Sequence, residues 1–178
     1  MNQDSPKVVT RPMKKINLSK VVVNIGVGKS GELLEKAARA LEELTGQKPT
    51  LRGAKRTVRD FGIHKGEPIA AMVTLRREPA NRFLRRAIAA RRNILNLSSF
   101  DEYGNLSIGI REHIDLPETK YNPDIGIFGM DVSVALSRPG YSIAKKRARR
   151  PIGKGHRITK NEAILFFQEE FGAQVSDA

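Results

Sequence analysis

The sequence predicts an α+β fold, with a largely antiparallel β-sheet, helices packed on one face and a polar face left open. Every well-marked strand segment has one face that is apolar throughout, opposite a face of mostly small or polar residues. A doubly wound parallel sheet would need strands that are apolar on both faces. Strand and helix segments also fail to alternate strictly along the chain, which argues against that class.

The first half of the chain predicts one strand, one helix and an edge segment. The strand is expected over residues 17–27 and the helix over residues 31–44, with Ser30 as its N-cap and Gly46 just past its end. Residues 47–52 are confined to a sheet edge by Pro49. Residues 53–68 form a long basic loop, a kind of loop that is usually functional or disordered.

The second half predicts three strands, over residues 69–76, 106–111 and 130–136, and two helices, over residues 78–95 and 159–171. An irregular connection spans residues 112–129, and a basic segment spans residues 137–158. The apolar side of the last helix is assigned to Ile164, Leu165, Phe167 and Phe171. The strand alternation gives the open face these residues: Asn24, Met72, Thr74, Arg76, Ser107, Gly109, Ser133 and Ala135.

Length and composition predict one domain. The 178 residues are enough for a buried core, and the absence of cysteine excludes disulfides and thiolate metal sites. Residues 1–15 are polar and aperiodic, so we expect a flexible tail followed by a single domain over residues 16–178. No apolar run approaches the roughly 20 residues of a membrane span. We therefore expect a soluble cytoplasmic protein with no membrane partner.

The charge predicts a polyanionic partner. The chain carries 32 Lys and Arg against 19 Asp and Glu, and residues 138–160 hold nine basic side chains and no acidic one. Basic residues gathered in blocks are typical of nucleic-acid binding, although a solvated basic face is the simpler alternative. The RNA-contacting residues expected in this segment are Lys145, Lys146, Arg147, Arg149, Arg150, Lys154 and Arg157.

A glycine motif raises a second hypothesis. Gly26, Gly28 and Gly31 spell G-x-G-x-x-G between a strand and a helix, as in dinucleotide-binding sites. The acidic residue required about 20 positions later is missing. Arg52 stands there and would suit a 2′-phosphate, so an NADP-linked enzyme remains open. The alternative is a tight turn with close helix–sheet packing. A Walker P-loop is excluded because Val23 occupies the position of its leading glycine.

No catalytic or metal site is predicted, and no cofactor. His64, His113 and His156 lie far apart without ligand spacing, so each is interpreted as a surface or loop histidine. Glu112, His113 and Asp115 have nothing to orient them as acid–base machinery. We therefore expect a protein that is not an enzyme.

Several long segments resemble one family. They are KVVVNIGVG at residues 20–28, TGQKP at 45–49, AKRTVRDFGIHKGEPIAAMVTLR at 54–76, YGNLSIGIREHI at 103–114 and GMDVSVAL at 129–136. Together they closely resemble the ribosomal protein L5 family, over residues 16–171. Residues 138–163 are similar to its archaeal and eukaryotic branch, which points to an archaeal protein.

The resemblance implies a structural constituent of the large ribosomal subunit that binds 5S rRNA in the central protuberance and helps attach it. Matched by position, Asn24, Gln47 and Thr74 correspond to polar 5S rRNA contacts. Amide and hydroxyl groups suit base edges and 2′-OH groups. Phosphate contacts would come from Lys48, Arg52, Lys55, Arg56 and Arg76.

Further partners are implied by the same resemblance. The loop over residues 59–67, with Arg59, Phe61, His64 and Lys65, matches a loop that approaches P-site tRNA. The connection over residues 112–129 lies where the family bridges toward a protein of the small-subunit head. The resemblance also implies contacts with 23S-type rRNA and neighbouring large-subunit proteins.

A third hypothesis is a basic chaperone or architectural RNA binder without a cognate RNA.

Overall fold

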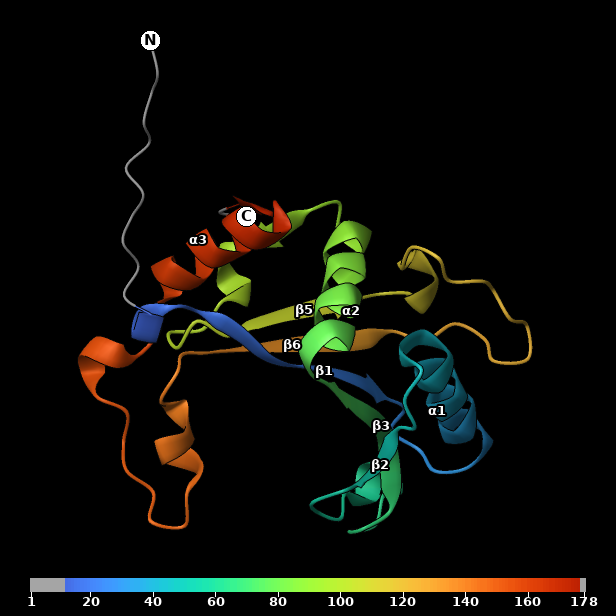
Figure 1. Cartoon of the computed structure of the whole chain (residues 1–178). Coiled ribbons are helices and arrows are strands. Elements are labelled where there is room, and N and C mark those ends of the chain that lie inside the picture. Colours follow the sequence, from blue (N-terminus) through green and yellow to red (C-terminus); the bar gives the residue numbers. More distant parts are fainter. Residues whose placement is uncertain (1–11, 177–178) are drawn as a thin grey trace.

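A five-stranded sheet with helices on one side forms the centre of the computed structural model, which describes residues 12–176 (Figure 1). The strands are β1 (Asn17–Gly26), β2 (Thr50–Gly53), β3 (Pro68–Leu75), β5 (Leu106–Ile110) and β6 (Met130–Ser137). Their order is β2-β3-β1-β6-β5, and all neighbours are antiparallel. The helices are α1 (Glu32–Thr45), α2 (Arg77–Ala90) and α3 (Lys160–Phe171). The predicted α+β class is confirmed.

The core lies between the sheet and the helices. Val23 of β1 pairs with Val73 of β3 on one side and with Val132 of β6 on the other, and all three are buried. Each helix turns an apolar stripe to this layer, as the 3.6-residue period requires. The stripe of α1 includes these four buried residues: Leu34, Ala37, Leu41 and Leu44.

The helix α2 is shorter than the sequence predicted. It ends at Ala90, and Arg92 and Asn93 take left-handed backbone angles, with φ of 56° and 61°. The chain then enters β4 (Ile94–Asn96), which pairs in parallel with β7 (Gln174–Ser176). Leu95 is still buried, but in this strand rather than in a helix. A three-residue strand is too short to show a period of its own, and only its distant partner defines it.

The start of α1 differs from the prediction as well. Gly31, not Ser30, holds the N-cap position, and its φ of 106° is one that side-chain-bearing residues rarely adopt. The Ser30 hydroxyl instead donates to the Glu67 carboxylate at 2.5 Å. The turn before α1 is therefore tied to the loop before β3. The C-terminal end at Gly46, with φ of 66°, is as predicted.

Two burial predictions are wrong. Leu165 is 55% exposed, while Ala163 and Phe167 carry the contact of α3 with the core. His113, expected at the surface, is buried, and its Nδ1 accepts a hydrogen bond from the Phe128 N–H at 3.2 Å. An imidazole that accepts one such bond tolerates burial because only its other nitrogen needs a partner.

The loop between β2 and β3 is an ordered hairpin extension. Backbone hydrogen bonds join Ala54 to Glu67 and Val58 to Ile63, and residues 59–61 form a single 3₁₀ turn. At Gly53 an added Cβ would lie 2.8 Å from the Gly66 carbonyl oxygen. This close approach needs glycine, because any side chain there would press on backbone.

Residues 1–11, most of the predicted flexible tail, lie outside the described residues, and Pro12–Lys14 form a 3₁₀ turn. No helix within residues 12–176 is long and apolar enough to cross a membrane. The same residues contain no group of three or more His, Asp and Glu side chains that could hold a metal ion.

Candidate nucleic-acid interface

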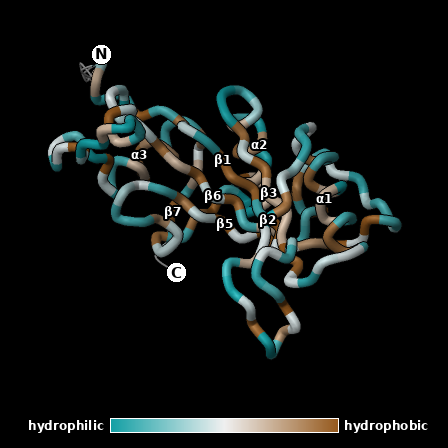
Figure 2. The backbone as a smooth tube through the Cα atoms, turned by 90° about the horizontal axis from the view of Figure 1, so that it is seen from below, coloured by the Kyte–Doolittle hydropathy of each residue, from teal (hydrophilic) through white to brown (hydrophobic). Residues whose placement is uncertain are grey.

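The side of the sheet opposite the helices carries the predicted open face, and Figure 2 views the molecule from that side. Strand register places Asn24 between Met72 of β3 and Asp131 of β6. One step along, Val22 lies between Thr74 and Ser133. Asn24 and Thr74, both half-buried, therefore occupy adjacent central strands on one surface, as predicted.

Four residues of this face were missed by the sequence reasoning, although the same period of two could have found them. Thr50 and Asp131 lie in the row of Asn24, and Lys20 and Val22 follow along β1. Asp131 adds an acidic side chain to this polar face, and a carboxylate only accepts hydrogen bonds. Its partners would be amino or hydroxyl groups rather than phosphates.

The remaining predicted contacts at the sheet are grouped at its β2 edge and at the end of β3. Arg52 faces the open side opposite Ala70, and Arg76 directly follows β3. Gln47 and Lys48 are exposed just before β2. The Gln47 N–H donates to the Thr45 hydroxyl at 3.3 Å, so the backbone that carries this amide is fixed to the end of α1.

Two basic projections flank the open face. The first is the hairpin extension over residues 54–67 and the second is the segment over residues 138–158; both extend on the side opposite the helices, at opposite ends of the sheet (Figure 1). The structure thus places the predicted residues in three groups rather than in one cluster. The exposed basic residues on the first projection are Lys55, Arg56, Arg59 and Lys65.

The tip of the hairpin extension combines an exposed aromatic ring with a rigid base. Phe61 is 72% exposed, and His64 is also exposed. The Glu67 carboxylate accepts the His64 N–H at 2.9 Å as well as the Ser30 hydroxyl. These two hydrogen bonds lower the pKa of Glu67 below its ordinary value of 4.5. An ionised Glu67 therefore holds the loop against the turn before α1.

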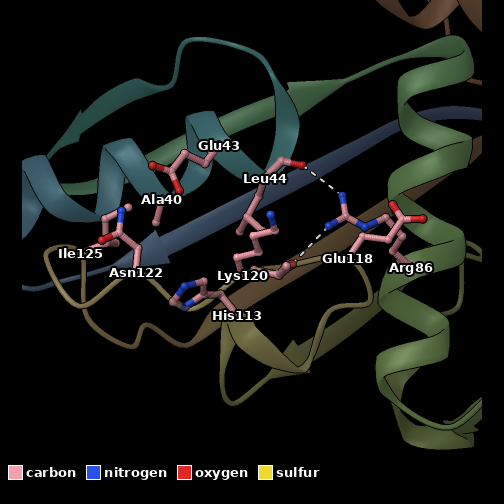
Figure 3. A pocket seen from close by; sticks show the side chains of 10 residues that line it. Ala40, Glu43, Leu44, Arg86, His113, Glu118, Lys120, Asn122 and Ile125 are labelled. Atoms are coloured by element: carbon pink, nitrogen blue, oxygen red, sulfur yellow. Dashed lines mark hydrogen bonds between the residues drawn. The ribbon is translucent and has the colours of Figure 1, made fainter.

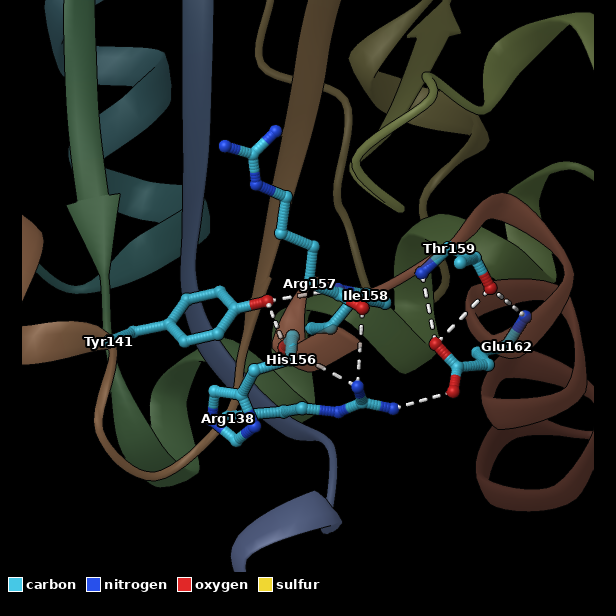
Figure 4. Close-up of polar contacts among 7 residues, drawn as sticks. All are labelled: Arg138, Tyr141, His156, Arg157, Ile158, Thr159 and Glu162. Carbon is cyan, nitrogen blue, oxygen red and sulfur yellow. Dashed lines mark hydrogen bonds and ion pairs between the residues drawn. The ribbon is translucent and has the colours of Figure 1, made fainter. Parts of the chain in front are cut away.

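The second projection is anchored by Arg138, which is buried at the end of β6 (Figure 4). Its guanidinium donates to the Glu162 carboxylate at 2.7 Å and to the Arg157 carbonyl at 3.2 Å. Glu162 also accepts the N–H of Thr159, the residue that caps α3. The ion pair between Arg138 and Glu162 therefore joins both ends of the basic segment. All seven of its predicted contact residues, from Lys145 to Arg157, are exposed.

The glycine motif forms a tight turn. The N–H groups of Val27 and Gly28 both donate to the Ile69 carbonyl at 3.0 Å. Dinucleotide sites depend on free N–H groups at this point of the turn. Two of them are already used here, which favours the packing interpretation over a cofactor site.

A hollow of about 210 Å³ lies on the helix side, between α1, α2 and the connection over residues 112–129 (Figure 3). Arg86 of α2 spans it, donating to the carbonyls of Pro117 at 3.0 Å and Leu44 at 3.2 Å. It also donates to the Thr119 hydroxyl at 3.2 Å. Glu43, Glu118 and Lys120 give the hollow mixed charge, so it does not extend the basic surface.

An open polar sheet face between two basic projections defines a basic α+β protein that presents a surface for a large polyanion. Residues 11–64 match the family model described as ribosomal protein L5, and residues 68–166 match the model of the C-terminus of the same ribosomal family. This chain belongs to the ribosomal protein L5 family. It is accordingly a ribosomal protein and not an enzyme, which excludes the NADP hypothesis.

The curated relatives agree in length as well as in sequence. The chain is 55% identical over 165 residues to the large ribosomal subunit protein uL5 of Pyrobaculum aerophilum, covering 92% of each chain. It is 51% identical over 166 residues to the large ribosomal subunit protein uL5 of Nitrosopumilus maritimus, covering 93% of this chain and 96% of that one. Both are archaeal proteins, in line with the branch to which residues 138–163 are similar.

Proposed function

We propose that this protein binds 5S rRNA on the open face of its sheet and helps attach that RNA to the 23S-type rRNA. Its family membership makes it a constituent of the large ribosomal subunit, located in the cytoplasm. The observation that carries the proposal is the register of β1 and β3. It brings an amide, Asn24, and a hydroxyl, Thr74, to one open face with basic projections at both ends.

The chemistry of these side chains fits RNA. An Asn amide is both donor and acceptor, and a Thr hydroxyl serves either role, so both suit base edges and 2′-OH groups. Gln47 adds a second amide at the β2 edge. The exposed cations near this edge would hold phosphates, which supply affinity rather than sequence choice: Lys48, Arg52, Lys55, Arg56 and Arg76.

The projections suit further partners. The exposed ring of Phe61, together with Arg59, His64 and Lys65, would contact P-site tRNA from the hairpin extension. The connection over residues 112–129 would contact a protein of the small-subunit head. The seven cations between residues 145 and 157 would contact rRNA. Neighbouring large-subunit proteins would cover part of the remaining surface.

The test is a filter-binding titration of 5S rRNA and of tRNA over a range of salt concentrations. Phosphate contacts weaken with salt, by a log–log slope of roughly −0.7 to −0.9 per phosphate neutralised. We expect 5S rRNA to stay bound where tRNA is released. We also expect Asn24→Ala and Thr74→Ala each to weaken 5S rRNA binding about 3- to 10-fold, the value of one hydrogen bond.

The matched control is Asn161→Ala, which removes an exposed amide from α3 on the helix side of the sheet. It should leave 5S rRNA binding unchanged. Release of 5S rRNA and tRNA at the same salt concentration would instead indicate a basic architectural RNA binder without a cognate RNA. Wild-type affinity in both Asn24→Ala and Thr74→Ala would remove these two residues from the site.

A further inference from the structure

We propose that a hollow between the turn at residues 101–105 and the basic segment takes one unstacked nucleobase of the bound RNA. The hollow has a volume of about 340 Å³, within the range of small-ligand pockets. Buried Leu136 and Ile158 are among its lining residues, as are Tyr103 and Tyr141. Asn105 and Arg157 add polar groups. The proposal rests on the proposed RNA-binding function and adds to it a site for a single base.

The turn that carries Tyr103 is fixed in place. The Asp101 carboxylate accepts the N–H groups of Tyr103 at 2.9 Å and Asn105 at 2.7 Å. Gly104 is buried, with φ of 74°, and an added Cβ would lie 2.7 Å from the Ile158 side chain. The turn is therefore packed directly on the far end of the basic segment. A preorganised wall lowers the entropy cost of binding a small group.

Tyr141, another lining residue, is also held by hydrogen bonds (Figure 4). Its hydroxyl donates to the His156 carbonyl at 3.2 Å and accepts the Ile158 N–H at 2.9 Å. With its hydroxyl engaged in this way, Tyr141 contributes its ring to the hollow. Tyr103, by contrast, is 59% exposed at the rim. An exposed ring beside an apolar floor is the arrangement on which single-stranded bases stack.

Two polar groups of the hollow can hydrogen-bond an inserted base. The Asn105 amide nitrogen donates to the Asp101 carboxylate at 2.7 Å, which leaves the amide oxygen as an acceptor. The Arg157 Nε donates to the Ile152 carbonyl at 3.1 Å, which leaves its terminal nitrogens as donors. An acceptor beside donors can hydrogen-bond the polar edge of a pyrimidine, because cytosine and uracil each carry at least one donor next to an acceptor.

The charge of the basic segment favours RNA as the occupant. Residues 138–160 form one side of the hollow and carry nine basic residues and no acidic one, so phosphates on that side of an inserted base would be neutralised, whereas the turn at residues 101–105 carries Asp101 and Glu102. Asn105 also lines a second hollow, of about 390 Å³, on the open face beside Val22, Ser107 and Ser133. A strand that lies on the open face could thus place one nucleotide in the site.

The direct test adds mononucleotides to the full-length protein. The readout is the change in the NMR chemical shifts of the backbone amides of Tyr103, Asn105 and Ile158. We expect cytidine monophosphate and uridine monophosphate both to shift these amides. Ribose 5-phosphate should not shift them. Tyr103→Ala should abolish the shifts and Tyr103→Phe should retain them. Equal shifts with ribose 5-phosphate, or shifts confined to the exposed Lys and Arg residues, would overturn the proposal.

The second test is 5S rRNA binding. Tyr103→Ala should weaken it about 5- to 150-fold, the value of one stacked base, without changing the salt slope. Tyr121→Ala is the matched control, since Tyr121 is 58% exposed but lies in the connection over residues 112–129. It should bind as the wild type does. Wild-type binding by Tyr103→Ala would overturn the base site alone, whereas equal affinity for 5S rRNA and tRNA would overturn the proposed function alone.

Discussion

At the scale of single residues, Arg138 shows how one buried charge positions a long basic segment. Segments this rich in Lys and Arg repel themselves and often order only on their partner. Here the guanidinium bonds the Arg157 carbonyl near the far end of the segment and the carboxylate of Glu162 in α3. Its Nε is buried and has no hydrogen-bond partner within residues 12–176. The pair with Glu162 and the hydrogen bonds to the carbonyls of His156 and Arg157 compensate for burying this charge.

The charge of Glu162 should make stability depend on pH. Burial raises the pKa of this carboxyl, but the Thr159 N–H and Arg138 lower it by more, so the net pKa lies below its ordinary 4.5. The stabilisation is therefore present above pH 4.5 and is lost as the pH falls through the lowered value. Glu162→Gln keeps a capping-box side chain but removes the charge. We expect a loss of about 1–2 kcal/mol in the free energy of unfolding at pH 7.

Urea unfolding of the wild type and of Glu162→Gln, at pH 7 and at pH 3, measures this effect. The difference between them should shrink at pH 3. Glu32→Gln is the control, because Glu32 pairs with Lys36 at 2.9 Å on the exposed side of α1. It should leave stability nearly unchanged. An equal difference between wild type and Glu162→Gln at both pH values would contradict the assignment.

At the scale of elements, Arg86 joins three parts of the helix side. Its guanidinium donates to the Leu44 carbonyl in the last turn of α1. It also donates to the Pro117 carbonyl and the Thr119 hydroxyl, both in the connection over residues 112–129. The planar guanidinium can donate to these three acceptors at once because its N–H groups point in fixed, different directions. The connection has little regular structure of its own, so this clamp and the buried His113 hold it in place.

Arg86→Lys should loosen this connection, because an ammonium keeps the charge but cannot reach three acceptors in different directions. We expect faster hydrogen exchange over residues 115–125 and a loss of about 1–3 kcal/mol in the free energy of unfolding. Arg82→Lys changes an exposed arginine on the same helix and is the control. Unchanged exchange in Arg86→Lys would show that other contacts fix the connection.

At the scale of the whole molecule, the two family models meet inside one sheet. Residues 11–64 supply β1 and β2, and residues 68–166 supply β3, β5 and β6. The central pairings of β1 with β3 and β6 cross this boundary, as does the pairing of β2 with β3. We propose that the chain from residue 16 onward folds as one unit, because neither part has a complete sheet of its own.

Cooperative unfolding tests this proposal. The three tyrosines, Tyr103, Tyr121 and Tyr141, all lie in the second part, so their fluorescence follows that part alone. Far-ultraviolet circular dichroism follows both parts, including α1. We expect the two signals to give one coincident urea transition. A separate transition seen only by circular dichroism would mean that the first part unfolds on its own.

The strands of the main sheet could be predicted from local patterns, because one buried face forces a period of two, and the mostly small and polar composition of the open face followed from the same alternation. The sequence by itself also determined the family, through several long motifs. The helix α1 was placed within a residue or two at each end, since its apolar stripe and Gly46 are local signals.

Tertiary structure alone decided the features that depend on a distant partner. The strand β4 exists because β7 pairs with it from the other end of the chain. Ser30 does not cap α1, because its hydroxyl donates instead to the carboxylate of Glu67, 37 residues away. His113 and Arg138 became buried because Phe128 and Glu162 satisfy them. Local patterns carry no information about such partners. The hollow beside Tyr103 is likewise formed by segments some 30 to 55 residues apart, which only the fold brings together.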